Sequence, residues 1–285
     1  MTPVQTTEVK PFFISRTARE KARVILAGAP LDVTGSFRGG TKYAPQAVRD
    51  ISWTLEEYSI LEKRSIGEAA FFDAGDIFFT GDLGHNLDEI EAFVAATRGE
   101  GRKPLLIGGE HLITYPAVRG LAKAHPDLCF LVLDAHTDLG DPDRQMSVSH
   151  ATTTRLVFDL LGKGRVFQFG PRSGLKEDLP FIERNFVFGR EAPADEVLER
   201  LAGKPVYVSV DIDVLDPSEA PGVTTPELLG WSFRTLSDLL DRMGILKNVV
   251  GADVVEICPP FDPAGVTALA GATVLRKLIF LMDRP

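Results

Sequence analysis

"LVLDAHTDLGD" (residues 131–141) joins an apolar run to three side chains that can bind metal ions. The apolar run is typical of a strand that is buried on both faces of a parallel sheet. Asp134, His136 and Asp138 follow at alternate positions. Because side chains alternate between the two faces of an extended strand, this spacing directs all three the same way if the extended conformation persists. The stretch therefore predicts a buried strand that ends at a metal site.

Similar apolar runs recur along the chain, with amphipathic stretches between them. The expected strands are residues 23–29, 104–109, 128–134, 165–170, 205–213 and 248–257. One expected helix begins at Asn86 as its N-cap, with Glu89 completing a capping box. Regular alternation of strands and helices predicts an α/β protein of three layers, in which helices cover both faces of a mainly parallel sheet.

The composition is that of a globular protein. Hydrophobic residues make up 44% and charged residues 25% of the chain. No run of about 18 apolar residues occurs, so no membrane span is expected. The sequence shows no internal repeat and no linker-like segment, so we expect one domain over residues 1–285. The N-terminus lacks a signal-peptide pattern and the two cysteines are too few for a disulfide framework, which indicates a cytoplasmic protein.

The formal net charge of −9 bears on possible partners. It argues against nucleic acid and against an anionic membrane, because both favour clustered Lys and Arg. An acidic field favours a small cationic ligand instead. The Gly-rich stretch "TGSFRGGTKYAP" (residues 34–45) follows the first expected strand and is expected to be a functional loop. It lacks a dinucleotide-binding fingerprint, so we expect no phosphate site there.

Two more apolar runs end in polar motifs. "GGEH" places His111 just after one run, and "DID" places Asp211 and Asp213 at the end of another. Ligands of α/β proteins collect beyond the carboxyl ends of parallel strands, so we expect these residues to converge with those of "DAHTD". Taken alone, each could be a capping aspartate or a hydrogen-bonded loop histidine. Their joint occurrence after three apolar runs favours a metal site.

The charges of this cluster predict two metal ions. Four aspartates carry −4 and two neutral imidazoles carry no charge, so two divalent cations neutralise the set. Six protein ligands exceed what one tetrahedral zinc accepts but suit two ions that share bridging carboxylates. Oxygen-rich ligation with imidazole and without thiolate favours two Mn²⁺ ions per chain. The pKa of water falls from about 15.7 in bulk to roughly 7 on a single zinc, so such a site predicts a hydrolase.

These motifs resemble those of the ureohydrolase family, which comprises the arginases and agmatinases. The resemblance covers nearly the whole chain and is carried by "GAPLDVTGSFRGGTKYAPQAVR", "GGEHLITYP", "DAHTDL", "VSVDID" and "DVVEICPP". "LEEYS", "DAGDI" and "PRSG" resemble bacterial agmatinases more than arginases. The resemblance implies an arginase-like fold, homo-oligomers such as trimers or hexamers, and hydrolysis of agmatine to putrescine and urea, a step of polyamine biosynthesis.

The resemblance also implies a role for each motif residue. One manganese ion is held by His111, Asp134, Asp138 and Asp211, and the other by Asp134, His136, Asp211 and Asp213. Asp134 and Asp211 are then the bridging carboxylates. His150 of the "SH" segment is the implied proton shuttle beside the substrate, and Glu256 of "VVE" holds the guanidinium.

Some segments depart from the usual agmatinase pattern. They are "SHATTTR" (residues 149–155), "APGVTTPELLGWS" (residues 220–232) and Pro263, which stands where many agmatinases have His. These segments border the part of the pocket that is expected to read the far end of the substrate. Other substrates therefore stay open: guanidinobutyrate, aminopropylagmatine, guanidine, arginine and formiminoglutamate. Trp231 could line this region, although a core position is the better expectation.

Two other classes of protein agree less well with the sequence than a binuclear enzyme does. A metal-binding paralogue without activity is expected to have lost a ligand, and all six are present. A zinc deacetylase of related fold keeps a single metal, and the presence of His111, Asp138 and both aspartates of "DID" argues against it.

Overall fold

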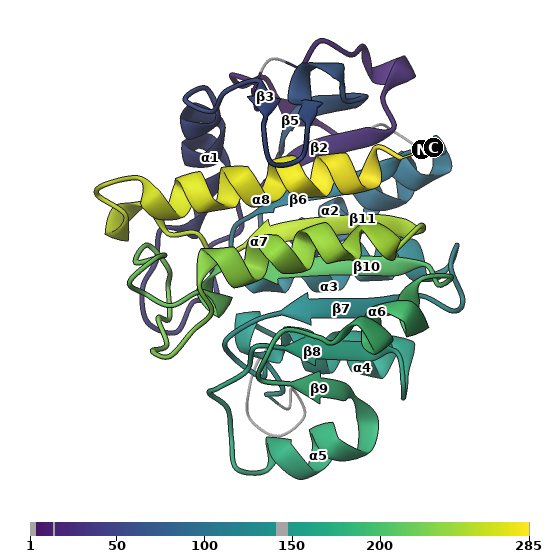
Figure 1. Ribbon diagram of the computed structural model, residues 1–285, viewed down its shortest axis with the longest axis vertical. Coiled ribbons are helices and arrows are strands. Elements are labelled where there is room, and N and C mark those ends of the chain that lie inside the picture. Colours follow the sequence, from purple (N-terminus) through teal and green to yellow (C-terminus); the bar gives the residue numbers. More distant parts are fainter. Residues whose placement is uncertain (1–3, 14, 141–147, 285) are drawn as a thin grey trace.

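A nine-stranded sheet forms the centre of the computed structural model, which describes residues 4–13, 15–140 and 148–284 (Figure 1). The strand order is β1-β5-β2-β6-β11-β10-β7-β8-β9, and among the described strands of this sheet only β1 pairs antiparallel. The strands are β1 (Thr6–Thr7), β2 (Val24–Ala29), β5 (Phe71–Ile77), β6 (Lys103–Gly108), β7 (Cys129–Leu133), β8 (Val166–Phe169), β9 (Val187–Gly189), β10 (Val206–Asp211) and β11 (Val249–Val255). A separate hairpin consists of β3 (Tyr58–Ser59) and β4 (Arg64–Ser65).

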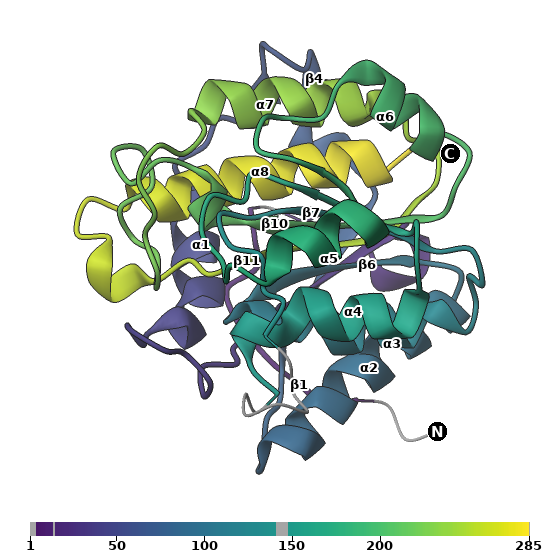
Figure 2. The same ribbon diagram turned by 90° about the horizontal axis from the view of Figure 1, so that it is seen from below.

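Helices cover both faces of the sheet (Figure 2). One face carries α1 (Ala44–Ser52), α6 (Asp195–Leu201), α7 (Phe233–Arg242) and α8 (Val266–Met282). The other carries α2 (Leu83–Gly99), α3 (Thr114–Ala122) and α4 (Thr153–Leu161). A further helix, α5 (Asp178–Asn185), contacts β9. A hydrophobic core lies between the sheet and each helix layer, so the predicted three-layer α/β architecture is confirmed.

All six expected strands form, as β2, β6, β7, β8, β10 and β11. β7, β10 and β11 are buried at every residue, as expected for parallel strands covered on both sides. β5 was not predicted, since its residues alternate between buried and half-buried and include Asp73 and Asp76. Among the helices of the described residues, none is long and apolar enough to cross a membrane.

Two local expectations concern the side chains of Asn86 and Trp231. The start of α2 was predicted wrongly: the helix begins at Leu83, because the Asp82 side chain accepts a hydrogen bond from the His85 N–H at 2.9 Å and caps it. Asn86 is buried in the first turn instead. Trp231 is in the core, where its indole N–H donates to the carbonyl of Arg190 at 2.9 Å.

The strand order places the functional motifs side by side. β6 and β7 follow one another in the chain, yet β11 and β10 lie between them in the sheet. Since all four strands run parallel, their carboxyl ends meet at one edge of the sheet. The motifs "GGEH", "VVE", "DID" and "DAHTD" follow these four neighbouring strands.

Candidate metal centre

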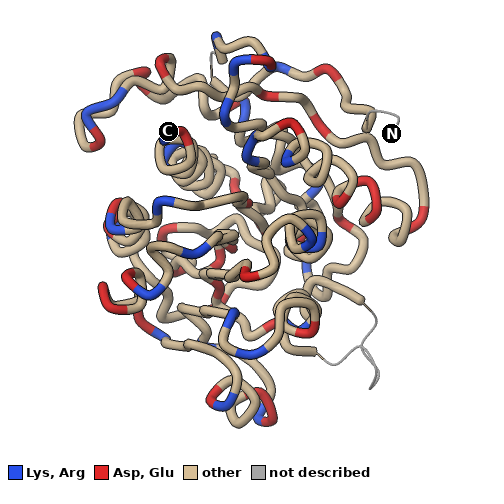
Figure 3. The backbone as a smooth tube through the Cα atoms, turned by 90° about the vertical axis from the view of Figure 1, so that its right-hand side faces the viewer, with Lys and Arg blue, Asp and Glu red and all other residues tan. Residues whose placement is uncertain are grey.

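The six predicted ligands lie together at this edge. His111 begins the short helix η4 (His111–Ile113). Asp211 ends β10, and the short helix η6 (Ile212–Val214), which contains Asp213, follows it directly. His111, Asp134, Asp211 and Asp213 are each at most 2% exposed. Figure 3 shows acidic residues on the outer helices and loops and also in the interior of the fold. Buried carboxylates of this kind require a compensating charge.

Three carboxylates surround one nitrogen of His111. Its Nδ1 atom lies 3.0 Å from Asp138 Oδ2, 3.2 Å from Asp134 Oδ2 and 3.3 Å from Asp211 Oδ2. Neither His111 Nδ1 nor Asp134 Oδ2 makes a hydrogen bond to any described residue, although both atoms are buried. Buried polar atoms without partners call for an ion or a water between them. The donor set of one imidazole and three carboxylates fits a divalent cation.

A second group surrounds His136. Its Nδ1 atom lies 2.9 Å from Asp213 Oδ2 and 3.6 Å from Asp134 Oδ1. Asp134 thus turns Oδ2 toward His111 and Oδ1 toward His136, and it belongs to both groups of residues that can hold a metal. Asp211 directs Oδ2 at His111, and its Oδ1 accepts the N–H of Asp213 at 2.9 Å, just as Asp134 Oδ1 accepts the N–H of His136 at 2.7 Å. Within the described residues, Asp134 is the carboxylate that belongs to both groups, which makes it a candidate bridging ligand.

The electrostatics of the cluster also fit cations. Burial raises the pKa of Asp211 well above its usual range, and the charges of Asp213 and Asp134 raise it further. Burial alone lowers the pKa of His136, but Asp213 and Asp134 outweigh this effect and raise it to about 12. Both shifts favour the protonated forms of Asp211 and His136 when no metal is bound. Two divalent cations would replace these protons and neutralise the four carboxylates.

A buried hydrogen-bond network fixes the protonated nitrogen of His111. Ser209 Oγ donates to Asp253 Oδ1 at 2.6 Å, and the hydroxyls of Thr114 and Tyr207 donate to Asp253 Oδ2 at 2.7 and 2.8 Å. The single hydrogen of Ser209 is used in this way, so its oxygen can only accept from His111 Nε2, 3.2 Å away. In the neutral imidazole the proton therefore sits on Nε2, and Nδ1 presents a lone pair to the three carboxylates.

This network predicts the effect of Ser209→Ala. Loss of the acceptor for Nε2–H leaves the His111 ring free to rotate and change tautomer, so Mn²⁺ affinity should fall about 10- to 100-fold. Isothermal titration calorimetry of the metal-free protein with MnCl₂ measures this change. Ser218→Ala removes an exposed hydroxyl that also donates to an aspartate but lies outside this network, and this variant should bind Mn²⁺ like the wild type. Equal losses in both variants would refute a specific role of Ser209.

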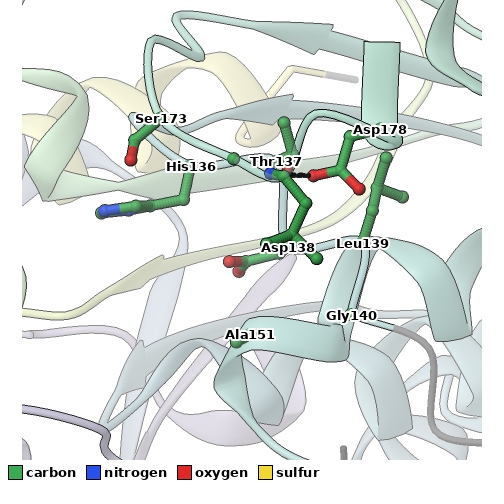
Figure 4. Close-up of a pocket in the computed structure, with 10 residues that line it drawn as sticks. His136, Thr137, Asp138, Leu139, Gly140, Ala151, Ser173 and Asp178 are labelled. Carbon is green, nitrogen blue, oxygen red and sulfur yellow. Dashed lines mark hydrogen bonds between the residues drawn. The ribbon is translucent and has the colours of Figure 1, made fainter. Parts of the chain in front are cut away.

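A cavity of about 270 Å³ adjoins the candidate metal ligands (Figure 4). His136 and Asp138 line this cavity together with Ala151. Thr137 and Asp178 also line it, and the Thr137 hydroxyl donates a hydrogen bond to Asp178 at 2.5 Å. Asp138 has a φ of +49°, a left-handed conformation that is rare for residues other than glycine. Such strained positions occur most often at functional sites.

Glu256 and His150 lie close to one another beside the same cluster. Glu256 follows β11 with a φ of +65°, and its Oε1 atom accepts the N–H of His111 at 2.6 Å. Its Oε2 atom accepts the hydroxyl hydrogen of Thr224. His150 begins η5 (His150–Thr152), and its Nδ1 atom is 3.8 Å from Glu256 Oε1. Burial raises the pKa of Glu256 to about 7.

Two supporting residues had not been singled out from the sequence. Arg172 donates to the carbonyls of Asp213 and Glu227, both at 2.8 Å, and so joins η6 to the loop 220–232. Gln168 on β8 donates to the carbonyls of His136 and Thr137 at 3.1 and 3.0 Å. Arg172 lies in "PRSG", a motif that resembles those of bacterial agmatinases but does not by itself indicate this contact. Nothing in the sequence around Gln168 marks its contact with "DAHTD".

The chain belongs to the arginase family, since the model of the "Arginase family" matches residues 22–281. The protein is accordingly a hydrolase, and the resemblance inferred from its motifs is confirmed. An agmatinase of Bacillus cereus is 40% identical over 276 residues, which cover 95% of each chain. A guanidinobutyrase of Pseudomonas aeruginosa is 32% identical over 90% of this chain and 85% of its own. The agmatine ureohydrolase structure of Thermoplasma volcanium superposes with a TM-score of 0.86 at 32% identity, covering 98% of this chain and 95% of that one.

Proposed function

We propose that this hydrolase cleaves agmatine into putrescine and urea with two bound Mn²⁺ ions. The observation that carries the proposal is the convergence of six candidate metal ligands with Glu256 and His150, next to a cavity that His136 and Asp138 line. Similarity to agmatinases over nearly the whole chain supports the substrate. His111, Asp134, Asp138 and Asp211 would hold one ion, and Asp134, His136, Asp211 and Asp213 the other. When bound, divalent ions of this kind lower the pKa of coordinated water and supply a nucleophile at neutral pH.

Glu256 is the proposed binding residue for the guanidinium. Each of its carboxylate oxygens accepts one hydrogen bond from the protein, so each keeps a second lone pair for a substrate N–H. A planar guanidinium can donate two parallel hydrogen bonds to one carboxylate, which fixes the position of its carbon. Because Glu256 also accepts the N–H of His111, a guanidinium bound to Glu256 would have its carbon beside the candidate metal ligands.

His150 is the proposed proton carrier. Departure of the amine requires a proton, and imidazole can exchange one near neutral pH. The Nε2 atom of His150 is buried and has no hydrogen-bond partner in the described part of the chain, so it is available to a ligand. Its position 3.8 Å from Glu256, measured from Nδ1 to Oε1, keeps it beside the guanidinium.

The negative charge of Glu227 favours a substrate that carries a positive charge at the end opposite its guanidinium. This residue lies in the loop 220–232, and its Oε1 atom is 3.8 Å from Nε2 of His136. Its side chain is 38% exposed, so a ligand can reach it. A negative charge here favours the ammonium of agmatine and disfavours the carboxylate of guanidinobutyrate.

Urea release from a panel of guanidino compounds tests this function. With the Mn²⁺-loaded protein, kcat/KM should be higher for agmatine than for guanidinobutyrate or arginine by at least about tenfold, because like charges repel at the rim. A preference for guanidinobutyrate would reassign the substrate, and the relative from Pseudomonas aeruginosa makes it the leading alternative. No urea from any compound would refute the proposed function.

We also propose a domain organisation, a cellular location and an oligomeric state for the protein. The whole chain is expected to form a single ureohydrolase domain, to act in the cytoplasm in polyamine biosynthesis and to assemble into a homo-oligomer of three or six copies. Sedimentation velocity of the Mn²⁺-loaded protein measures the number of copies directly.

A further inference from the structure

Glu110 is buried beside the metal-binding residues but belongs to neither candidate group. It stands next to His111 in "GGEH" and is 1% exposed. Its carboxylate faces the loop after β2, where Oε2 accepts the N–H groups of Val33 and Thr34, both at 2.8 Å. Its Oε1 atom accepts the hydroxyl hydrogen of Thr34 at 2.6 Å. Three hydrogen bonds thus compensate this buried carboxylate and fix the side chain of Thr34.

Thr34 in turn holds the backbone of His150. The N–H of His150 donates to Thr34 Oγ1 at 3.0 Å, across 116 positions of sequence. Because the one hydroxyl hydrogen of Thr34 goes to Glu110, its oxygen is oriented to accept. His150 is the first residue of η5, so its N–H has no acceptor within the helix. The side chain of Ser149 accepts from Thr152 instead, which leaves Thr34 to satisfy His150.

We propose that Glu110 and Thr34 form a latch that positions the imidazole of His150 for proton transfer. The inference rests on the role proposed above for His150. The latch ties η5 to the residue that precedes His111, and the N–H of His111 holds Glu256 at 2.6 Å. One set of contacts therefore positions both residues proposed to act on the guanidinium. A shift of about 1 Å at such a site can lower the rate by about 10²-fold.

The variants Thr34→Val and Thr34→Ser separate the effect of the hydroxyl on kcat from the effect of the side-chain shape. Valine keeps the shape but leaves Glu110 and the N–H of His150 without the Thr34 hydroxyl. We expect kcat for agmatine to fall about 10- to 100-fold in Thr34→Val, with two Mn²⁺ ions still bound, whereas serine restores most of the rate. Thr54→Val, a matched change at an exposed position, should leave kcat unchanged. Equal rates in the two Thr34 variants would overturn the latch.

A double-mutant cycle shows whether the latch acts through His150. Thr34→Val should add little to the loss caused by His150→Ala, because residues that act as one unit are not additive. Losses that multiply would mean that Thr34 acts elsewhere and would overturn the proposal.

Hydrogen exchange tests the latch without any substrate. Exchange of the His150 amide, measured by mass spectrometry, should be faster in Thr34→Val than in Thr34→Ser or the wild type. Unchanged exchange would overturn the latch even if agmatine is hydrolysed. Faster exchange in a protein that releases no urea would instead locate the failure in the proposed function.

Discussion

Asp134→Asn should lower urea release from agmatine by at least about 10³-fold, because this carboxylate belongs to both groups of candidate metal ligands. Its two oxygens face His111 and His136, at 3.2 and 3.6 Å from their Nδ1 atoms. An amide has one acceptor oxygen and carries no charge, so it cannot join two cations. The Mn²⁺ content after gel filtration should fall from two ions per chain to one or none.

The control for this change is Asp88→Asn, which removes a carboxylate whose side chain is 74% exposed on α2. It should keep both ions and full activity. Retention of two Mn²⁺ ions by Asp134→Asn, with more than about a tenth of the wild-type rate, would exclude Asp134 as the bridge.

Glu256→Gln should lower kcat/KM for agmatine by about 10²- to 10³-fold while both Mn²⁺ ions remain bound. The amide preserves the shape of the side chain and can still accept the N–H of His111 through its oxygen. Its nitrogen end, however, opposes the N–H groups of the guanidinium, and the negative charge is lost. Most of the loss should therefore appear as a raised KM.

Steady-state kinetics and metal analysis of the same preparation separate the two effects. Glu196→Gln, at an exposed position on α6, is the matched control and should behave as the wild type. Loss of bound Mn²⁺ in Glu256→Gln, or an unchanged kcat/KM, would contradict the assignment of Glu256 to the substrate.

The central strands could be predicted from the sequence because each is a continuous apolar run, as expected for a strand that is buried on both faces. β5 could not be predicted in this way, because Asp73 and Asp76 interrupt its apolar residues. Both carboxylates pair with the buried guanidinium of Arg49 on α1, at 2.8 Å from Nε to Asp73 and 2.5 Å from Nη1 to Asp76. A long-range ion pair of this kind compensates the charges of carboxylates in the interior, and no local periodicity reveals it.

The grouping of the candidate ligands was predictable for a related reason. Strand ends collect at one edge of a parallel sheet, so motifs that follow apolar runs must meet there. The contacts that support them were not predictable. Ser209 meets Asp253 across 44 positions and Glu110 meets Thr34 across 76, and these residue types are common in any loop or strand. Their partners are set by the strand order, in which β11 and β10 lie between β6 and β7.

Anomalous diffraction from crystals grown with MnCl₂ tests the binuclear centre most directly. Data collected at the manganese edge should show two peaks about 3.5 Å apart, as in other two-metal hydrolases. One peak should lie beside His111 Nδ1 and the other beside His136 Nδ1, with the carboxylate of Asp134 between them. A single peak, or two peaks away from these residues, would contradict a two-manganese site at this edge of the sheet.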